Sequence, residues 1–215
     1  MDQVTSGLRP KAGRPTREQA EARQHALLDT ALDHFLDKGF EQTTIEAIAQ
    51  DVGMTKRTVY ARHVDKVALF CAAVSRAIDR YIVPLHRIEA TDKGELEQTL
   101  VAIAWLRVEQ VMSPNGLKLQ RIINSESYRF PDIFEPFYER AAAPTMRFLA
   151  AVLERETRAG RLAVNDPDTA ANVFMSMVVG GPARMIVLGN PLSREAIAKR
   201  IEYAVRLFLD GARPR

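Results

Sequence analysis

Two short helices joined by a tight turn are predicted by the stretch TTIEAIAQDVGMTKRTVYARH, residues 43–63. Thr43, followed three residues later by Glu46, is typical of the capping box that begins a helix. The apolar residues of this first helix recur at helical spacing and therefore share one face: Ile45, Ile48, Ala49 and Val52. Gly53 ends the helix, because glycine readily adopts the positive φ of a tight turn. Thr55 then caps the second helix.

The spacing of Ala49, Gly53 and Val59 is typical of a helix-turn-helix. Ala49 is small where the two helices must cross closely, and Val59 anchors the second helix on the apolar core. This arrangement leaves Arg57 and Ala61 pointing away from the protein. We therefore expect the second helix to present an outer face to a partner.

The charge around the second helix predicts what that partner is. From Met54 to His63 the chain carries Lys56, Arg57 and Arg62 and no acidic residue, whereas a solvated helix face normally mixes both signs. An α-helix fits the major groove of DNA, where arginine pairs with guanine and short side chains touch the thymine methyl group. The sequence therefore favours a DNA-reading helix over an ordinary solvated one.

The rest of the chain is predicted to be helical as well. An apolar stripe from Leu27 to Leu36 ends at Gly39, and Asp65 caps a longer helix that runs to Pro84. Later helices are expected over residues 96–112, 117–129, 133–159, 168–179 and 194–209, with breaks at Pro144 and at Gly180-Gly181-Pro182. The predicted fold is all-α with about nine helices.

Composition narrows the classes of function. The chain has 215 residues, a net charge of +3, 47% apolar and 27% charged residues, as in ordinary globular proteins. With no apolar run of membrane length, no signal segment and a single cysteine, Cys71, a cytoplasmic protein without membrane contact is expected. The histidines, His25, His34, His63 and His86, are scattered without metal-ligand spacing. No catalytic or cofactor motif appears, so neither an enzyme nor a cofactor is expected.

The segment GFEQTTIEAIAQDVGMTKRTVYARHVDKVALF, residues 39–70, resembles the DNA-binding domain of TetR-type transcriptional repressors. It departs from the family pattern at His63 and Val64, where an aromatic residue and proline are common. The resemblance implies a basic arm over residues 1–16, a three-helix head with the helix-turn-helix over 17–64, and a larger helical ligand-binding and dimerisation domain over 65–215. It also implies a homodimer, a double-stranded DNA operator and a small-molecule effector.

Roles for particular residues follow from the resemblance. Thr44, Tyr60 and Lys66 are implied as phosphate contacts. The start of the reading helix comprises Thr55, Lys56, Arg57 and Thr58, with Arg57 the leading base reader. Arg62 and His63 lie beside this basic patch, where contact with phosphate is a further hypothesis. Arg14, in an acid-free N-terminal segment, is a candidate for the minor groove, although the same pattern suits a plain solvated terminus.

The C-terminal region is predicted less sharply. Helices 168–179 and 194–209 are the expected dimer seam, unless they pack only within one chain. Seven residues are candidates for an adaptable effector pocket, each open to the alternative of ordinary core or surface: Trp105, Glu109, Met112, Phe134, Phe137, Met146 and Met175. The expected function is a dimeric repressor released by a small apolar ligand. A constitutive or architectural DNA-binding protein is the alternative.

Overall fold

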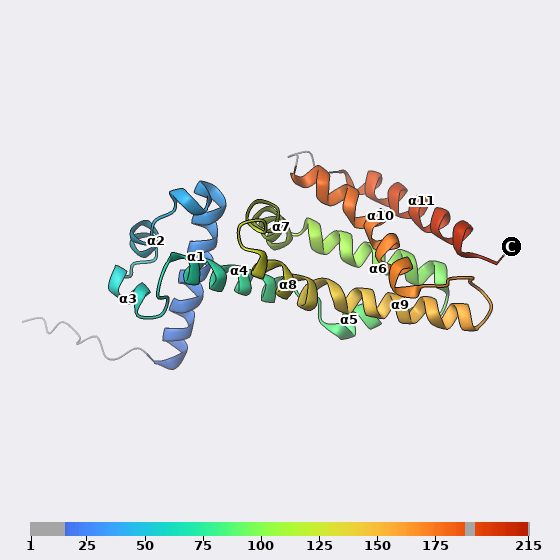
Figure 1. The fold of residues 1–215 in the computed structure, drawn as a ribbon, viewed down its shortest axis with the longest axis horizontal. Helices are drawn as coiled ribbons and strands as arrows, with labels where there is room; N and C mark the ends of the chain where they lie inside the picture. Colours follow the sequence, from blue (N-terminus) through green and yellow to red (C-terminus); the bar gives the residue numbers. More distant parts are fainter. Residues whose placement is uncertain (1–15, 188–191, 215) are drawn as a thin grey trace, which may run out of the picture.

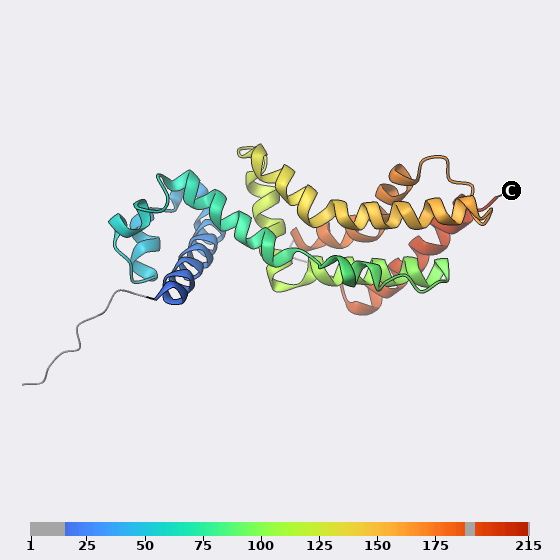
Figure 2. The same ribbon diagram turned by 90° about the horizontal axis from the view of Figure 1, so that it is seen from below.

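The computed structural model describes residues 16–187 and 192–214, and all of its regular elements are helices. Figure 1 shows a small head at one end of an elongated helical body. The head contains α1 (Arg17–Gln42), α2 (Ile45–Asp51) and α3 (Lys56–Tyr60). The long helix α4 (Lys66–Tyr81) runs from the head into the body, as Figure 2 shows from below. The prediction of an all-α fold with a three-helix head and a larger helical domain is confirmed.

The body is built from the remaining helices. In chain order these are α5 (Leu85–Glu89), α6 (Leu96–Met112), α7 (Pro114–Glu126), the 3-10 turn Pro131–Ile133, α8 (Phe134–Phe137), the π-helical turn Tyr138–Ala142, α9 (Ala143–Arg158), α10 (Pro167–Val187) and α11 (Arg194–Ala212). Helix α10 packs against α6, α9 and α11, and α7 packs against both α4 and α6. No helix in the described ranges is long and apolar enough to cross a bilayer.

Two apolar cores organise the chain. One lies between α6, α9, α10 and α11 of the body. The other fills the head and continues along α4 onto α7, so head and body share it. At its centre the rings of Phe40 and Phe70 lie 5.3 Å apart, and each is 4.9 Å from the ring of Phe130. Phe40 also packs back on Phe35 at 5.7 Å, as predicted for a residue that follows Gly39.

Polar contacts reinforce the join between head and body. Asp29 of α1 accepts hydrogen bonds from Arg76 at 3.0 Å and from Arg80 at 2.8 Å, both on α4. Two exposed ion pairs reach the head from α7 and the loop after it: Lys118 with Asp33, and Arg129 with Glu41. The position of α1 therefore depends on α4 and α7 together.

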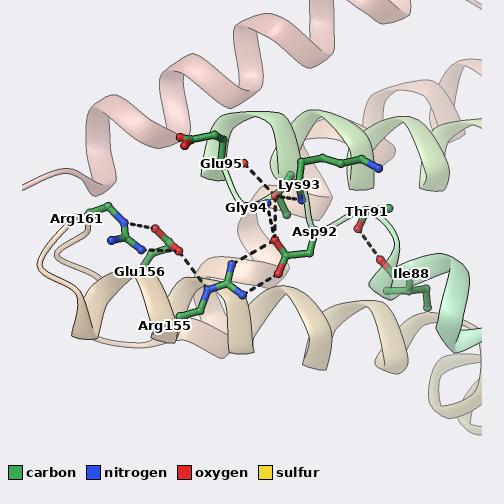
Figure 3. Close-up of polar contacts among 10 residues, drawn as sticks. Ile88, Thr91, Asp92, Lys93, Gly94, Glu95, Arg155, Glu156 and Arg161 are labelled. Atoms are coloured by element: carbon green, nitrogen blue, oxygen red, sulfur yellow. Dashed lines mark hydrogen bonds and ion pairs between the residues drawn. The ribbon is translucent and has the colours of Figure 1, made fainter.

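At the far end of the body, charged residues tie the loop before α6 to the end of α9. Figure 3 shows Arg155 between two carboxylates: it donates to Asp92 at 2.7 Å and to Glu156 at 3.3 Å. Arg161 donates to Glu156 at 2.6 Å. Glu156 is 2% exposed, and the hydrogen bond from Arg161 lowers the pKa of its carboxyl group. This buried charge is thus held by two cations.

Three sequence-based boundaries were wrong. Thr44, not Thr43, caps α2, and the Thr43 hydroxyl instead donates to the carbonyls of His34 and Gly39. Helix α7 begins at Pro114, because Ser113 caps it and proline suits the first turn. Helix α10 continues through Pro182, where packing on three neighbouring helices outweighs the cost of about 3 kcal/mol for an internal proline.

The predicted long helix over residues 133–159 is also several elements. A break near Pro144 is confirmed, since α9 begins at Ala143 with the proline in its first turn. The segment before it is shorter and less regular than predicted: a 3-10 turn, one turn of α-helix and a π-helical turn.

We predict that Phe70→Ala lowers the free energy of unfolding by about 3–5 kcal/mol, because Phe70 is fully buried at the centre of the shared core. Urea denaturation measures the change. Val64→Ala is the matched control, since Val64 is 80% exposed and its loss changes stability by less than about 0.5 kcal/mol. Equal denaturation midpoints for the two variants would contradict the shared core.

Candidate nucleic-acid interface

The turn between α2 and α3 has the geometry of a helix-turn-helix. Gly53 has φ of +66°, in the left-handed region that favours glycine. Ala49 is 3% exposed where the helices approach, and Val59 is completely buried. The steric roles predicted for these three residues are confirmed. Because Val59 fixes the rotation of α3, the opposite face of that helix is turned outward.

The first turn of α3 is held by a hydroxyl cap. Thr55 Oγ1 accepts a hydrogen bond from the backbone N–H of Thr58 at 3.1 Å, and the two hydroxyls lie 2.8 Å apart. Thr44 caps α2 in the same way, accepting from the backbone N–H of Ala47 at 3.2 Å. All three threonine side chains are exposed, so both helix starts face solvent beside the turn.

The cations of α3 differ in their surroundings. Arg57 is exposed, and its side chain makes no ion pair or hydrogen bond with the part of the chain that the structure describes. Lys56 instead pairs with Glu46 of α2 and lies 5.6 Å from the ring centre of Tyr60. The hydrogen bond from Lys56 lowers the pKa of the Glu46 carboxyl group. The patch that is free of acids in the sequence therefore has an acid beside it in space, and within α3 Arg57 is the cation that no described carboxylate neutralises.

Arg62 and His63 are both joined to α1 through Gln24. Arg62 donates to the side-chain oxygen Oε1 of Gln24 at 2.8 Å, and the side-chain nitrogen Nε2 of Gln24 lies 2.9 Å from Nε2 of His63. His63 is 9% exposed. Burial, with a smaller effect from Arg62, lowers the pKa of this imidazole below its usual value. His63 therefore packs the end of α3 against α1, while Arg62 remains on the surface.

Lys66 occupies an internal hydrogen-bonding site. Its Nζ donates to the carbonyl oxygens of Phe40 at 2.9 Å, Glu41 at 3.2 Å and Thr43 at 3.1 Å. It also lies 4.5 Å from the ring centre of Phe40. A cation is favourable here, because the last carbonyls of a helix have no partner within the helix. The contact with DNA phosphate implied for Lys66 remains a prediction, beside this observed role in capping the end of α1.

Tyr60 is 42% exposed at the end of α3 and is free to reach a ligand outside the protein.

Arg23, on α1, is a further cation near this surface that the sequence did not single out, because it lies in a segment rich in acids. The structure places it in a groove that Thr58 and Arg62 also line. Arg14 lies outside the described residues.

The seven candidate effector residues are dispersed over both cores and the surface. The guanidinium of Arg194 covers Trp105 at 4.8 Å from the ring centre and pairs with Glu109 at 3.1 Å. Phe137 packs on Tyr81 at 5.8 Å in the first core, and the side chain of Phe134 lies outside the described set. Three others belong to the second core: Met112, Met146 and Met175.

Comparison with known proteins identifies the family. Residues 27–73 match the sequence model described as bacterial regulatory proteins of the tetR family. Residues 98–211, which are more than half of the chain, match the model of the AefR-like transcriptional repressor C-terminal domain. The chain belongs to the TetR family of transcriptional regulators. The first matched segment runs from α1 through α2 and α3 into α4, and the AefR-like region begins within α6.

Similar proteins extend over most of this TetR-family chain. An HTH-type transcriptional repressor from Mycobacterium tuberculosis is 24% identical over 199 residues, which cover 89% of this chain and 97% of the relative. Among solved structures, the Flavonoid-responsive Regulator FrrA is 33% identical, with a TM-score of 0.69, covering 91% of this chain and 99% of its own. A TetR family transcriptional regulator from Pseudomonas syringae pv. tomato shares the fold at 20% identity and a TM-score of 0.68. The match covers 94% of this chain and 100% of that structure's chain.

We predict that Lys66→Ala lowers the free energy of unfolding by about 1–2 kcal/mol, because three carbonyls at the end of α1 lose a charged donor. Thermal and urea denaturation measure the change. Lys38→Ala, at an exposed lysine of α1, is the control. A variant as stable as the control but weaker on all DNA would assign Lys66 to phosphate contact alone.

Proposed function

We propose that this TetR-family regulator is a repressor that binds a near-palindromic operator as a homodimer and is released by a small molecule. The observation that carries the proposal is Arg57, exposed and unpaired on a helix whose rotation Val59 and the Gly53 turn fix. Its guanidinium suits bidentate pairing with guanine in the major groove. The protein acts by binding, without catalysis, on DNA in the cytoplasm.

Within the interface we assign two kinds of contact. Arg57 and the exposed side chain of Thr58 read base edges, while Thr44, Thr55, Tyr60 and Arg62 contact phosphates and fix the register of the helix. Lys56 is already paired with Glu46, so we assign it only a contribution to the electrostatic potential around the interface. Arg14 extends the contact into the minor groove. Removal of residues 1–15 tests that last assignment, since identical affinity at low salt would eliminate it.

The dimer is supported by exposed apolar side chains on α10 and α11. Val173 is 49%, Tyr203 64% and Leu207 54% exposed. A single reading helix recognises only a few base pairs, whereas two of them placed about 34–36 Å apart read two half-sites with useful affinity. We therefore assign this face to the two-fold contact between copies of the chain.

Ligand control is supported by the relative FrrA, which is named a flavonoid-responsive regulator. A ligand that binds one arrangement of the two heads better than the other shifts the dimer toward that arrangement and changes operator affinity. Helix α4, which enters the shared core and reaches the head, is the proposed connection. The second candidate is a DNA-binding protein without ligand control. In its architectural form it binds random DNA almost as tightly as any chosen sequence, and in its constitutive form no compound changes operator binding.

Selection of bound sequences from a random duplex pool tests the proposal directly. An inverted repeat is expected, and its half-site spacing reports the separation of the two reading helices. Enrichment of no sequence would support the architectural candidate. Enrichment of a single half-site would contradict the two-fold assembly.

We predict that Arg57→Ala weakens binding to the selected operator by about 1–3 kcal/mol and relaxes sequence preference at one position of each half-site. The reason is the loss of a base-edge contact while the phosphate contacts remain. Fluorescence anisotropy with matched and mismatched duplexes measures both effects. Arg121→Ala, an exposed arginine on α7, is the control and leaves both unchanged. Unaltered discrimination by Arg57→Ala would remove it as the base reader.

We predict that Leu207→Glu converts the dimer to a monomer at micromolar concentration, because it places a charge within an apolar contact. Light scattering measures the mass of the particle. Leu85→Glu is the matched control, since Leu85 on α5 is also exposed, at 56%, but lies away from the proposed seam. A wild-type monomer, or equal effects of both substitutions, would refute this assignment of the seam.

A further inference from the structure

A buried arginine without a counter-charge lies inside the body. Arg107, on α6, is 5% exposed. Its Nη1 donates to the backbone carbonyl of Ala141 at 3.1 Å and to the side-chain oxygen of Gln110. Nε is buried without a hydrogen-bond partner, and no carboxylate of the described residues forms an ion pair with the guanidinium. One edge of the guanidinium, the Nε side, is therefore unused.

This environment is energetically unusual. Burial lowers the pKa of Arg107, yet an arginine remains charged under all ordinary conditions. A buried charge that lacks a partner destabilises a folded protein. The same body treats its buried carboxylate differently, since Glu156 is held by both Arg155 and Arg161 (Figure 3). Arg107 thus stands out as a cation whose natural partner is not in the chain.

Further features surround this edge. The guanidinium lies 6.0 Å from the ring centre of Tyr81, which in turn packs on Phe137. The Tyr81 side chain is 3% exposed, and burial raises the pKa of its hydroxyl. That hydroxyl makes no hydrogen bond of good geometry with the described residues, although Gln120 lies close enough to lower its pKa. The carbonyl of Ala141 belongs to the π-helical turn Tyr138–Ala142, and such turns occur frequently at functional sites. A cation, a buried hydroxyl and two aromatic rings therefore meet beside an irregular helical turn.

We infer that Arg107 is the recognition group for the carboxylate of a small effector with an aromatic or apolar body. A carboxylate accepts two parallel hydrogen bonds from one edge of a guanidinium, and Nε of Arg107 has no such bond within the described residues. Because packed atoms cover Nε, the effector reaches it by displacing them. The ring of the effector packs against Tyr81 and Phe137, and the Tyr81 hydroxyl gains a polar partner. This inference rests on the proposed ligand control and replaces a purely apolar effector with an anionic one.

Matched acid and amide pairs test the inference. The probes are benzoate, 4-hydroxybenzoate, salicylate and cinnamate, each beside its neutral amide, at constant ionic strength. Calorimetric titration and thermal denaturation measure binding to the full-length protein. At least one acid is expected to bind about tenfold or more tightly than its amide, because the amide lacks the charge that pairs with Arg107. Equal binding of acids and amides, or binding of none of the acids, would overturn the inference.

Substitutions then locate the site. Arg107→Gln is expected to abolish the preference for acid over amide, whereas Arg121→Gln, at an exposed position, retains it. Arg107→Lys keeps the charge but lacks the planar guanidinium, so it is expected to reduce the preference for acid over amide. This variant replaces Arg107→Gln in the test if the glutamine variant does not fold. Retention of the full preference in a folded Arg107 variant would refute the site.

Operator binding separates this inference from the proposed function. A wild-type protein that selects an inverted repeat but prefers no acid leaves the repressor proposal intact and refutes only the anionic effector. A protein that prefers an acid at Arg107 but selects no inverted repeat refutes the repressor proposal. An acid that binds at Arg107 and also lowers operator affinity supports both.

Discussion

The contact of Phe70 with Phe40 and Phe130 is the constraint on which the rest of the structure depends. Phe40 belongs to the last turn of α1, Phe70 belongs to α4 and Phe130 follows α7, so three separate parts of the chain meet at one cluster of rings. Phe70 is fully buried and Phe130 partly so, and closely packed rings of this size contribute strongly to stability and tolerate little displacement. The head therefore cannot move independently of α4 and α7.

This constraint connects the outer surface of the head with the interior of the body. Val59 fixes α3 on the head, and the aromatic cluster fixes the head on α4. At its other end α4 carries Tyr81, which lies beside Arg107. One helix thus reaches from the core beneath the reading helix to the buried cation, a separation that a 16-residue helix spans rigidly.

Local rules made most of the head predictable. A glycine at a tight turn, threonine caps and an apolar stripe each act within a few residues, so Gly53, Thr55 and Val59 could be assigned from the sequence alone. The body was less predictable, because tertiary packing overrides local preference there. Pro182 remains inside α10, whereas the chain before Pro144 adopts a π-helical turn that no propensity rule indicates.

At the candidate site the turn and the exposed cation Arg57 were predictable from the sequence, but the pairing of the side chains was not. The contacts of Lys56 with Glu46, and of Lys66 with the end of α1, join residues at least ten positions apart, so spacing alone does not reveal them. Arg107 did leave a signal, since it shares the buried face of α6 with Leu100, Ile103 and Val111. A single arginine on an apolar stripe of this kind indicates a buried charge.

The exposed ion pairs between head and body have a further consequence for measurements on DNA. Lys118–Asp33 and Arg129–Glu41 are solvent-exposed, so dissolved ions weaken them over the same concentration range in which they compete for phosphate. Added electrolyte therefore weakens the polar part of the join between head and body, which the aromatic core still holds, while it displaces the protein from the duplex. The slope of affinity against ionic strength then contains both processes, and it overstates the number of phosphates that the protein neutralises.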